Sequence, residues 1–224
     1  MSDTHDAKRG PRALGDVADL LEEEIVLGIR YPRERLVEDE LMDRFAAKRH
    51  VVRGALQELE NRRLIERRHN VGAFVKAYTA KEVRDIYAVR ELLEVHCARI
   101  IKLPVAPERI EELIATQHQH DTAIKSGDLR GVVRANTAFH QALFALSDNE
   151  ALVAAILQHA QMTYVIRSVT VTSREYLERA QQEHWAMIRA LEEQTRELLL
   201  ETCKAHLLPS RDAYLQRIAA LSSS

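Results

Sequence analysis

The sequence predicts a mainly α protein, in which a small domain of short helices and a β-ribbon precedes an all-α antiparallel helical bundle. Only 7 of the 224 residues are Gly and 5 are Pro, so few residues interrupt helices. Apolar residues recur at helical spacing along most of the chain, and strand-like runs around a turn occur only near residues 64–75. The length allows two modest domains, each with its own core.

The small domain is predicted from the order of its elements. Two short helices are followed by two short apolar runs that flank a turn containing Gly72. This order is the layout of a winged helix-turn-helix. The expected elements are a helix from Leu14 that ends near Gly28, a short helix over 36–45, a helix over about 49–61, and strands at Leu64-Ile65 and 73–75.

The rest of the chain is predicted to be helical, and short joins between its helices imply an antiparallel bundle. Pro209 lies inside the last helix and is expected to bend or break it. The expected helices cover about 81–102, 107–126, 128–146, 150–171, 173–193 and 195–221. We therefore expect a disordered tail over 1–11, a winged helix-turn-helix domain over 12–76, a linker over 77–80 and an all-helical domain over 81–224.

Several features favour a cytoplasmic protein. No apolar run follows the first basic residues, so no signal peptide is expected. The longest apolar run, from Ala151 to Leu157, is far too short to span a bilayer, and no membrane partner is expected. Cys97 and Cys203 lie inside helical patterns and form no CxxC motif, which is typical of reduced core thiols.

Charge is unevenly distributed over the small domain. Residues 13–43 carry ten acids and three bases, whereas residues 44–76 carry nine bases and three acids, a local charge of +6. The basic stretch coincides with the third helix and the ribbon, which favours contacts with DNA phosphates. Arg49 and Arg53 lie one turn apart on the polar side of that helix, and each can bind guanine through two hydrogen bonds. The candidate DNA-binding residues are Arg49, His50, Arg53, Gln57, Arg67, Arg68 and Gly72.

Three histidines are candidates for a metal site in the bundle. Asn136 and His140 are four residues apart and share one face of a helix. His184 and His206 lie on the expected inward faces of two later helices. Neutral imidazoles together with an amide or carboxylate oxygen suit Zn²⁺, Ni²⁺ or a similar divalent transition metal. A single inward histidine is more often an ordinary core residue, and sequence spacing between helices fixes no distances.

The stretch YPRERLVEDELMDRFAAKRHVVRGALQELENRRLIERRHNVGAFV resembles the winged-helix domain of the GntR family of bacterial transcription regulators. The RLVEDEL opening, the KRHVVRGALQELE helix and the GAFV wing follow in the family's order. The resemblance implies that Arg49 and Arg53 read DNA and that Gly72 is the glycine of the wing tip. Asp39 stands where the family usually has a basic residue.

Residues 81–220 resemble the all-helical ligand domain of the FadR subfamily in its six-helix, VanR-like form, on the stretches YAVRELLE, FHQALFALSDNEAL and EHWAMIRAL. The resemblance implies a metal held by Asn136, His140, His184 and His206, with Asn136 where the family more often has Asp. It also implies a small carboxylate effector, for which Arg90 is the first candidate contact and Arg167 the second. The expected function is a homodimeric, metabolite-responsive regulator that binds a double-stranded DNA operator, usually as a repressor.

Two other functions are weighed against this one. A helical metal-dependent enzyme, such as a phosphohydrolase, would use an inward His-Asp pair, and His120-Asp121 is such a pair in sequence. It lies in a polar stretch, so we expect His118 and His120 on a solvated face and we do not expect an enzyme. A helical module whose winged helix binds protein instead of DNA is the third possibility, and the local charge of +6 argues against it.

Overall fold

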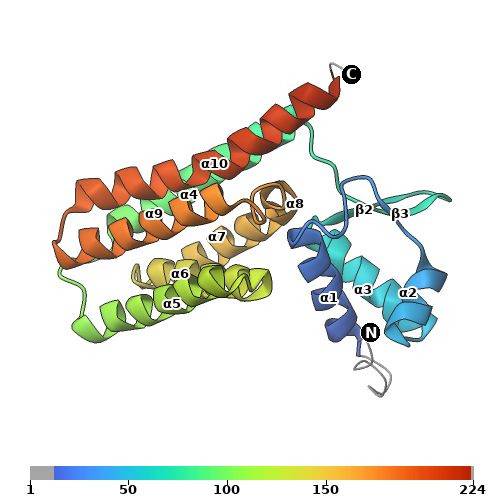
Figure 1. The fold of residues 1–224 in the computed structure, drawn as a ribbon, viewed down its shortest axis with the longest axis horizontal. Helices are drawn as coiled ribbons and strands as arrows, with labels where there is room; N and C mark the ends of the chain where they lie inside the picture. Colours follow the sequence, from blue (N-terminus) through green and yellow to red (C-terminus); the bar gives the residue numbers. More distant parts are fainter. Residues whose placement is uncertain (1–12, 223–224) are drawn as a thin grey trace. The chain divides into compact units, whose positions relative to one another are not determined.

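The computed structural model describes residues 13–222, and the expected tail over 1–11 lies outside them. The chain forms two compact units, which Figure 1 shows and which are described separately below. Of the described residues, 13–25 and 29–77 form the N-terminal unit, and 26–28 and 78–222 form the C-terminal unit.

The N-terminal unit has the predicted order of helices and ribbon. Its antiparallel sheet has the strand order β1-β3-β2, with Arg35 opposite Phe74 and Arg68 opposite Gly72. The two-residue strand β1 was not predicted, because two residues show no alternation of apolar and polar side chains. The elements are α1 (Leu14–Val26), β1 (Arg35–Leu36), α2 (Glu38–Phe45), α3 (Arg49–Asn61), β2 (Ile65–Arg68) and β3 (Gly72–Val75).

The core of this unit fixes which side of α3 faces outward. Val52, Leu56 and Leu59 of α3 are buried, as α3 packs against α2 and β2. Burial of each such side chain contributes about 1.5–3 kcal/mol, so the helix cannot rotate its apolar side into water. The opposite side, which carries Arg49 and Arg53, is thereby held at the surface.

The C-terminal unit is a bundle of helices, and the predicted mainly helical fold is confirmed. In Figure 1, α4 and α10 lie side by side, and so do α5 and α6, in agreement with their packing. The core between the helices contains Phe139, Leu143 and Ile188. The helices are α4 (Ala80–Ile100), α5 (Pro107–Ser126), α6 (Leu129–Ala145), α7 (Glu150–Met162), α8 (Tyr164–Arg167), α9 (Arg174–Glu192) and α10 (Arg196–Ser222).

The prediction of one helix over 150–171 is wrong. The chain leaves helical geometry at Thr163, between α7 and α8, and α8 ends at Arg167. The Thr163 hydroxyl donates to the Ala160 carbonyl at 2.7 Å and accepts from Arg90 Nη1 at 3.2 Å. Arg90 lies 73 positions earlier in the chain, so the break is fixed by tertiary contacts. Pro209, in contrast, is accommodated inside the single helix α10.

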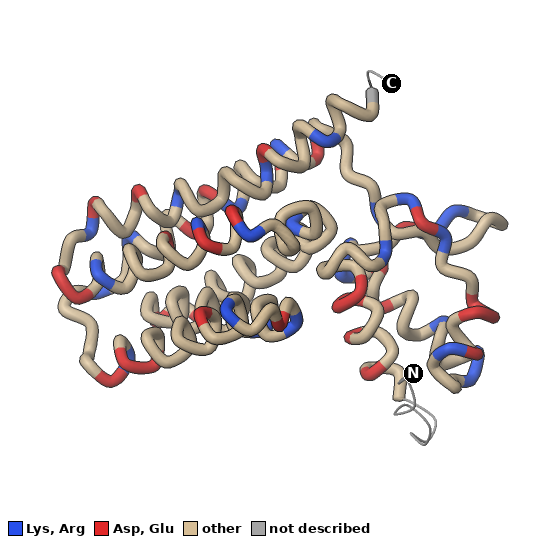
Figure 2. The backbone as a smooth tube through the Cα atoms, viewed as in Figure 1, with Lys and Arg blue, Asp and Glu red and all other residues tan. Residues whose placement is uncertain are grey.

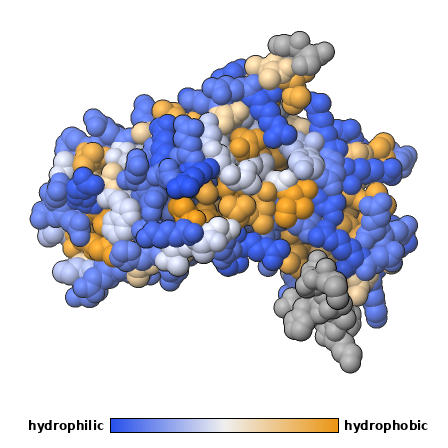
Figure 3. All heavy atoms as spheres, in the orientation of Figure 1, coloured by the Kyte–Doolittle hydropathy of each residue, from blue (hydrophilic) through white to orange (hydrophobic). Residues whose placement is uncertain are grey.

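The surface of the bundle is mostly polar. On the face shown in Figure 3, hydrophilic residues cover much of the C-terminal unit, and hydrophobic residues show in patches between them. Lys, Arg, Asp and Glu are interspersed along its helices in Figure 2. Among residues 13–222, no helix combines the length and the apolar character that a membrane span requires.

Replacement of Thr79 by Ala is expected to destabilise the bundle by about 1 kcal/mol, because Thr79 caps α4. Its hydroxyl accepts from the Glu82 backbone N–H at 3.2 Å, while the Glu82 carboxylate accepts from the Thr79 backbone N–H at 2.8 Å. Urea unfolding measures the loss. Thr79→Ser keeps the hydroxyl and is the control, and equal stability of the Ala and Ser variants would contradict the assigned cap.

Candidate functional site

Three histidines from three helices meet inside the C-terminal unit. His140 of α6, His184 of α9 and His206 of α10 each offer one ligand atom, and these atoms lie within 4.8 Å of one another. The Nε2 atoms of His140 and His206 are 3.1 Å apart. Asn136, one turn before His140, is buried beside them. The structure therefore brings together the four residues that were predicted to hold a metal.

Buried polar atoms without partners indicate what this cluster can bind. Asn136 Nδ2, His140 Nδ1 and His184 Nε2 have no hydrogen-bond partner among the described residues. An unpaired buried polar group costs about 1–3 kcal/mol, so such a concentration points to a missing ligand. Rotation of the Asn136 amide would offer its oxygen in place of its nitrogen. The residues present thus fit a divalent transition metal with three nitrogen ligands and one amide oxygen.

The outer nitrogens of two of these histidines are hydrogen-bonded. His206 Nδ1 lies 2.7 Å from Glu183 Oε2, and His184 Nδ1 lies 2.8 Å from Gln117 Oε1. Metal-ligating histidines usually donate their second N–H to such an oxygen, which fixes the ring and leaves the inner nitrogen free for the metal. Sequence analysis missed both partners. Helical spacing could have indicated that Gln117 faces inward, because it lies four residues after the buried Leu113 on α5.

Two histidines of the cluster, His140 and His184, are held in their neutral form. Burial, together with the neighbouring His206 and Arg167, lowers the pKa of both His140 and His184 well below the usual value. Burial alone would raise the pKa of Glu183, but hydrogen bonds from His206 and Arg179 outweigh it and lower that pKa. Neutral imidazoles beside an ionised carboxylate are the protonation states that a metal requires of its ligands and their partners.

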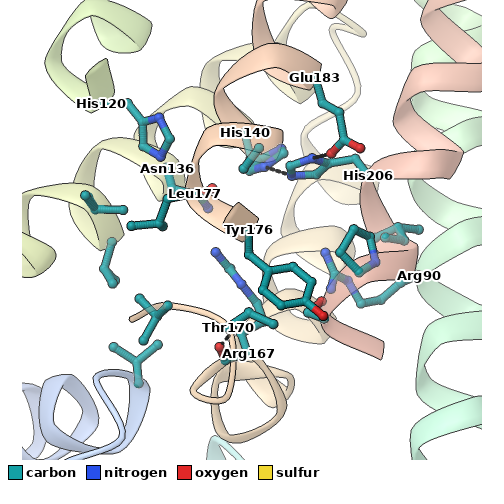
Figure 4. A pocket seen from close by; sticks show the side chains of 18 residues that line it. Arg90, His120, Asn136, His140, Arg167, Thr170, Tyr176, Leu177, Glu183 and His206 are labelled. Carbon is teal, nitrogen blue, oxygen red and sulfur yellow. Dashed lines mark hydrogen bonds and ion pairs between the residues drawn. The ribbon is translucent and has the colours of Figure 1, made fainter. Parts of the chain in front are cut away.

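Two adjoining cavities of about 90 and 230 Å³ reach the cluster. Asn136, His140, Arg90 and Arg167 line both of them. Figure 4 shows His140 and His206 together beside Glu183, with the side chains of Arg90 and Arg167 projecting into the same cavity. Each cavity is smaller than the pockets of roughly 300–1,000 Å³ that bind drug-sized ligands, so a smaller molecule would fit.

The two arginines of the cavity differ in their partners. Arg90 Nε lies 2.8 Å from Glu94 Oε1 in a buried ion pair. Arg167 pairs with no carboxylate among the described residues, and its guanidinium carbon lies 6.0 Å from the ring centre of Tyr164. Burial, followed by the charge of Arg90, acts to lower the pKa of Arg167. The charge of Arg90 is already balanced by Glu94, whereas Arg167 has no ion-pair partner among the described residues and is available to bind an anion in the cavity.

The expectation that His120 lies on a solvated face is wrong. His120 is 1% exposed and lines the smaller cavity, whereas His118 is exposed as expected. Burial lowers the pKa of His120 to about 4, so the ring is neutral near pH 7. The inward side of α5 carries the polar Gln117 and His120 between Leu113 and Ala123. Because two of these four residues are polar, hydrophobicity alone does not mark this side of the helix as buried.

The predicted DNA-reading residues of α3 lie on its exposed side. The side chains of Arg49 and Arg53 are 53% and 59% exposed. Arg49 Nη2 lies 2.6 Å from Asp39 Oδ1, and Arg53 Nε lies 2.9 Å from Glu38 Oε2. Both acids belong to the first turn of α2. These ion pairs across two helices were not predicted.

The remaining candidates lie on α3 and on the ribbon. His50 is exposed, and Gln57 Nε2 lies 3.3 Å from an oxygen of Glu60. Arg67 Nη2 donates to the Arg53 carbonyl at 3.0 Å, which ties the ribbon to α3. The Arg68 guanidinium lies over the Phe74 ring at 4.6 Å. Gly72 has a φ of 126°, which favours glycine, and begins β3 directly after the turn.

Two family descriptions match the chain in the order predicted. The family described as bacterial regulatory proteins, gntR family, matches residues 14–75, and the FCD domain matches residues 85–208. The second match alone covers more than half of the chain.

Two bacterial proteins are similar to this chain in sequence along most of their length. In Bacillus subtilis (strain 168), the uncharacterized HTH-type transcriptional regulator YdhC is 27% identical over 190 residues, which cover 84% of this chain and 83% of that protein. The gluconate operon transcriptional repressor of the same organism is 26% identical over 192 residues, covering 83% and 78% respectively.

Solved structures support the fold. A transcriptional regulator GntR from Rhodococcus sp. RHA1 superposes with a TM-score of 0.75 at 23% identity, covering 92% of this chain and 98% of that one. E. coli McbR/YncC superposes with a TM-score of 0.71 at 19% identity, covering 94% and 97%. The family match favours a regulator over the metal-dependent enzyme. The chain belongs to the GntR family of bacterial transcription regulators and carries an FCD effector-binding domain behind its winged helix.

Proposed function

We propose that this regulator represses transcription from a double-stranded DNA operator, and that a small carboxylic acid releases it by binding beside a metal in the C-terminal unit. The observation that carries the proposal is the three-histidine cluster, two of whose members, His140 and His206, line a cavity that Arg167 also lines. A carboxylate is the ligand that would satisfy both a metal and a guanidinium.

The metal would be Zn²⁺, Ni²⁺ or a similar divalent ion, held by Asn136, His140, His184 and His206. When bound, the ion would supply positive charge that attracts an anionic effector into the cavity. Glu183, the acid that lines the smaller cavity, is already engaged by His206 at 2.7 Å and by Arg179 at 2.8 Å. The charge of the ion would therefore be left for the effector to balance.

The effector is proposed to be held by Arg167, with Arg90 as a supporting contact. Arg167 has no ion-pair partner among the described residues, whereas Arg90 is paired with Glu94. An arginine can bind a carboxylate through two parallel hydrogen bonds, which also orients the ligand. The small volumes of the two cavities support a compact acid.

On DNA, α3 would enter the major groove with Arg49 and Arg53 toward base edges, supported by His50 and Gln57. Arg67, Arg68 and Gly72 of the ribbon would lie against the sugar-phosphate backbone or the neighbouring groove.

We propose that the chain binds DNA as a homodimer, so that two such heads read the half-sites of a symmetric operator. Repression as the sign of regulation is supported by the similarity to the gluconate operon transcriptional repressor. The effector would release DNA only to the extent that it binds the DNA-free state more tightly than the DNA-bound state.

Arg49→Ala and Arg53→Ala are each expected to weaken operator binding by about 5- to 150-fold, since a bidentate arginine–guanine contact contributes about 1–3 kcal/mol. Fluorescence anisotropy would measure binding to an operator that the wild type selects from random DNA. Arg174→Ala is the control, because Arg174 is an exposed arginine that is likewise paired with an acid, Glu178, at 2.7 Å. Unchanged affinity in both α3 variants would refute the assigned readers.

His140→Ala is expected to lower Zn²⁺ affinity by more than about 100-fold, since loss of even an outer-shell partner typically costs 10–100-fold. Competition with a chromophoric chelator measures this affinity, and elemental analysis gives the stoichiometry. His159→Ala is the control, because His159 Nδ1 bonds to the Ala155 carbonyl of its own helix at 2.8 Å. Equal Zn²⁺ affinity of the two variants would remove the metal site from the proposal.

Arg167→Leu is expected to abolish the thermal shift that the best acid from a screen gives with wild-type protein and Zn²⁺. At 100 times its Kd, such a ligand stabilises the wild type by about 2.7 kcal/mol. The empty variant is expected to be at least as stable as the wild type, because a partly buried charge without an ion-pair partner is removed. Arg109→Leu, at an exposed arginine paired with Asp148, is the control. A full shift in Arg167→Leu would exclude Arg167 from the effector site.

A further inference from the structure

A partly buried polar network lies behind His184, between α5 and α9. Its centre is Asp121, which accepts hydrogen bonds from Gln117 Nε2 at 2.6 Å, Gln181 Nε2 at 2.8 Å and Trp185 Nε1 at 3.1 Å. Gln117 is 0% exposed and also contacts His184. The network therefore links a carboxylate to a proposed metal ligand through a single amide side chain.

The carboxylate decides how the Gln117 amide is oriented. An ionised carboxylate only accepts hydrogen bonds, so the group 2.6 Å from Asp121 Oδ1 must be the amide nitrogen. The same nitrogen lies 3.4 Å from His120 Nδ1, which can accept its second hydrogen. The opposite orientation would set the amide oxygen against the carboxylate. The Gln117 oxygen is thus directed at His184 Nδ1, 2.8 Å away.

The orientation of Gln117 in turn decides where His184 carries its proton. An amide oxygen only accepts, so His184 Nδ1 must be the donor. A neutral imidazole has a single N–H, and with that proton on Nδ1 its Nε2 retains a lone pair. His184 Nε2 is buried without a partner, and His184 is one of the three clustered histidines, so Nε2 is the nitrogen it has free for a metal.

We propose that Asp121, acting through Gln117, is a positioning residue that fixes the tautomer of His184 and so directs the lone pair of its Nε2 at the metal position. The proposal rests on the proposed metal site. The carboxylate of Glu183 contacts His206 directly and orients it. The carboxylate of Asp121 reaches His184 only through the Gln117 amide, which adds no negative charge next to the ion.

The test is a pair of measurements on full-length Asp121→Asn. The new amide can donate to Gln117, which allows the Gln117 amide to reverse and His184 to move its proton to Nε2. Long-range ¹H–¹⁵N NMR of histidine rings in the metal-free protein reports the tautomer, with the signals of His184 assigned by their loss in His184→Ala. We expect Nδ1–H in the wild type, Nε2–H in Asp121→Asn, and a fall in Zn²⁺ affinity of about 10–100-fold in the variant.

Gln181→Leu is the matched control, because it removes another hydrogen bond of Asp121 without touching a histidine of the cluster; both readouts should stay unchanged. If Asp121→Asn does not fold, a second pair of variants tests whether Gln117 fixes the tautomer of His184. In Gln117→Glu a protonated carboxyl group would donate to Asp121 and accept from His184 Nδ1, so the Nδ1–H tautomer and Zn²⁺ affinity should be retained. In Gln117→Leu the acceptor is lost, and both should change.

An Nε2–H tautomer of His184 in the metal-free wild type would overturn the proposal. So would Zn²⁺ affinity in Asp121→Asn, or in Gln117→Leu, that equals the affinity of Gln181→Leu. A wild type that binds no Zn²⁺ would defeat the proposed metal site, yet its NMR spectrum would still confirm or refute the control of the His184 tautomer by Asp121.

Discussion

The C-terminal unit depends on burying several imidazole rings without charge. The Phe139 ring stacks on His184 with centroids 4.1 Å apart, and the Phe144 ring stacks on His140 at 5.8 Å. In surroundings of this kind an isolated charge costs several kcal/mol, so burial holds the rings in their neutral form. Every neutral ring keeps one lone pair. What the packed helices shield from solvent is therefore a set of electron-pair donors, and the hydrogen bonds behind the rings decide which way those donors face.

Much of the fold could be predicted because helical periodicity is local. The bounds expected for α5 agree with the structure, since Pro107 and Gly127 mark its two ends. The break between α7 and α8 could not be predicted, because Thr163 is held by Arg90 from a distant part of the sequence. The strand β1 exists through its pairing with Phe74 on β3, and a two-residue strand carries no pattern of its own.

The candidate site was predictable where spacing alone decides. Asn136 and His140 share a face because they are four residues apart on one helix. The approach of His184 and His206 depends on how α6, α9 and α10 pack, which no spacing within a helix reveals. The ion pair of Arg90 with Glu94 is the reason that Arg167 is proposed here as the first effector contact. The pairing of Arg90 with Glu94 is itself a four-residue spacing, so it could have been recognised in the sequence.

The carboxylates of Glu38 and Asp39 give the winged helix a property beyond its shape. In the proposed complex with a duplex, Arg53 and Arg49 would exchange these intramolecular partners for phosphate or base atoms. The exchange would leave two anions beside the sugar-phosphate backbone, where they would repel it. Nonspecific contacts with phosphates would compensate the loss of these ion pairs less well than a bidentate contact with guanine would. The two acids would therefore compete with DNA for the arginines and weaken binding to DNA of arbitrary sequence.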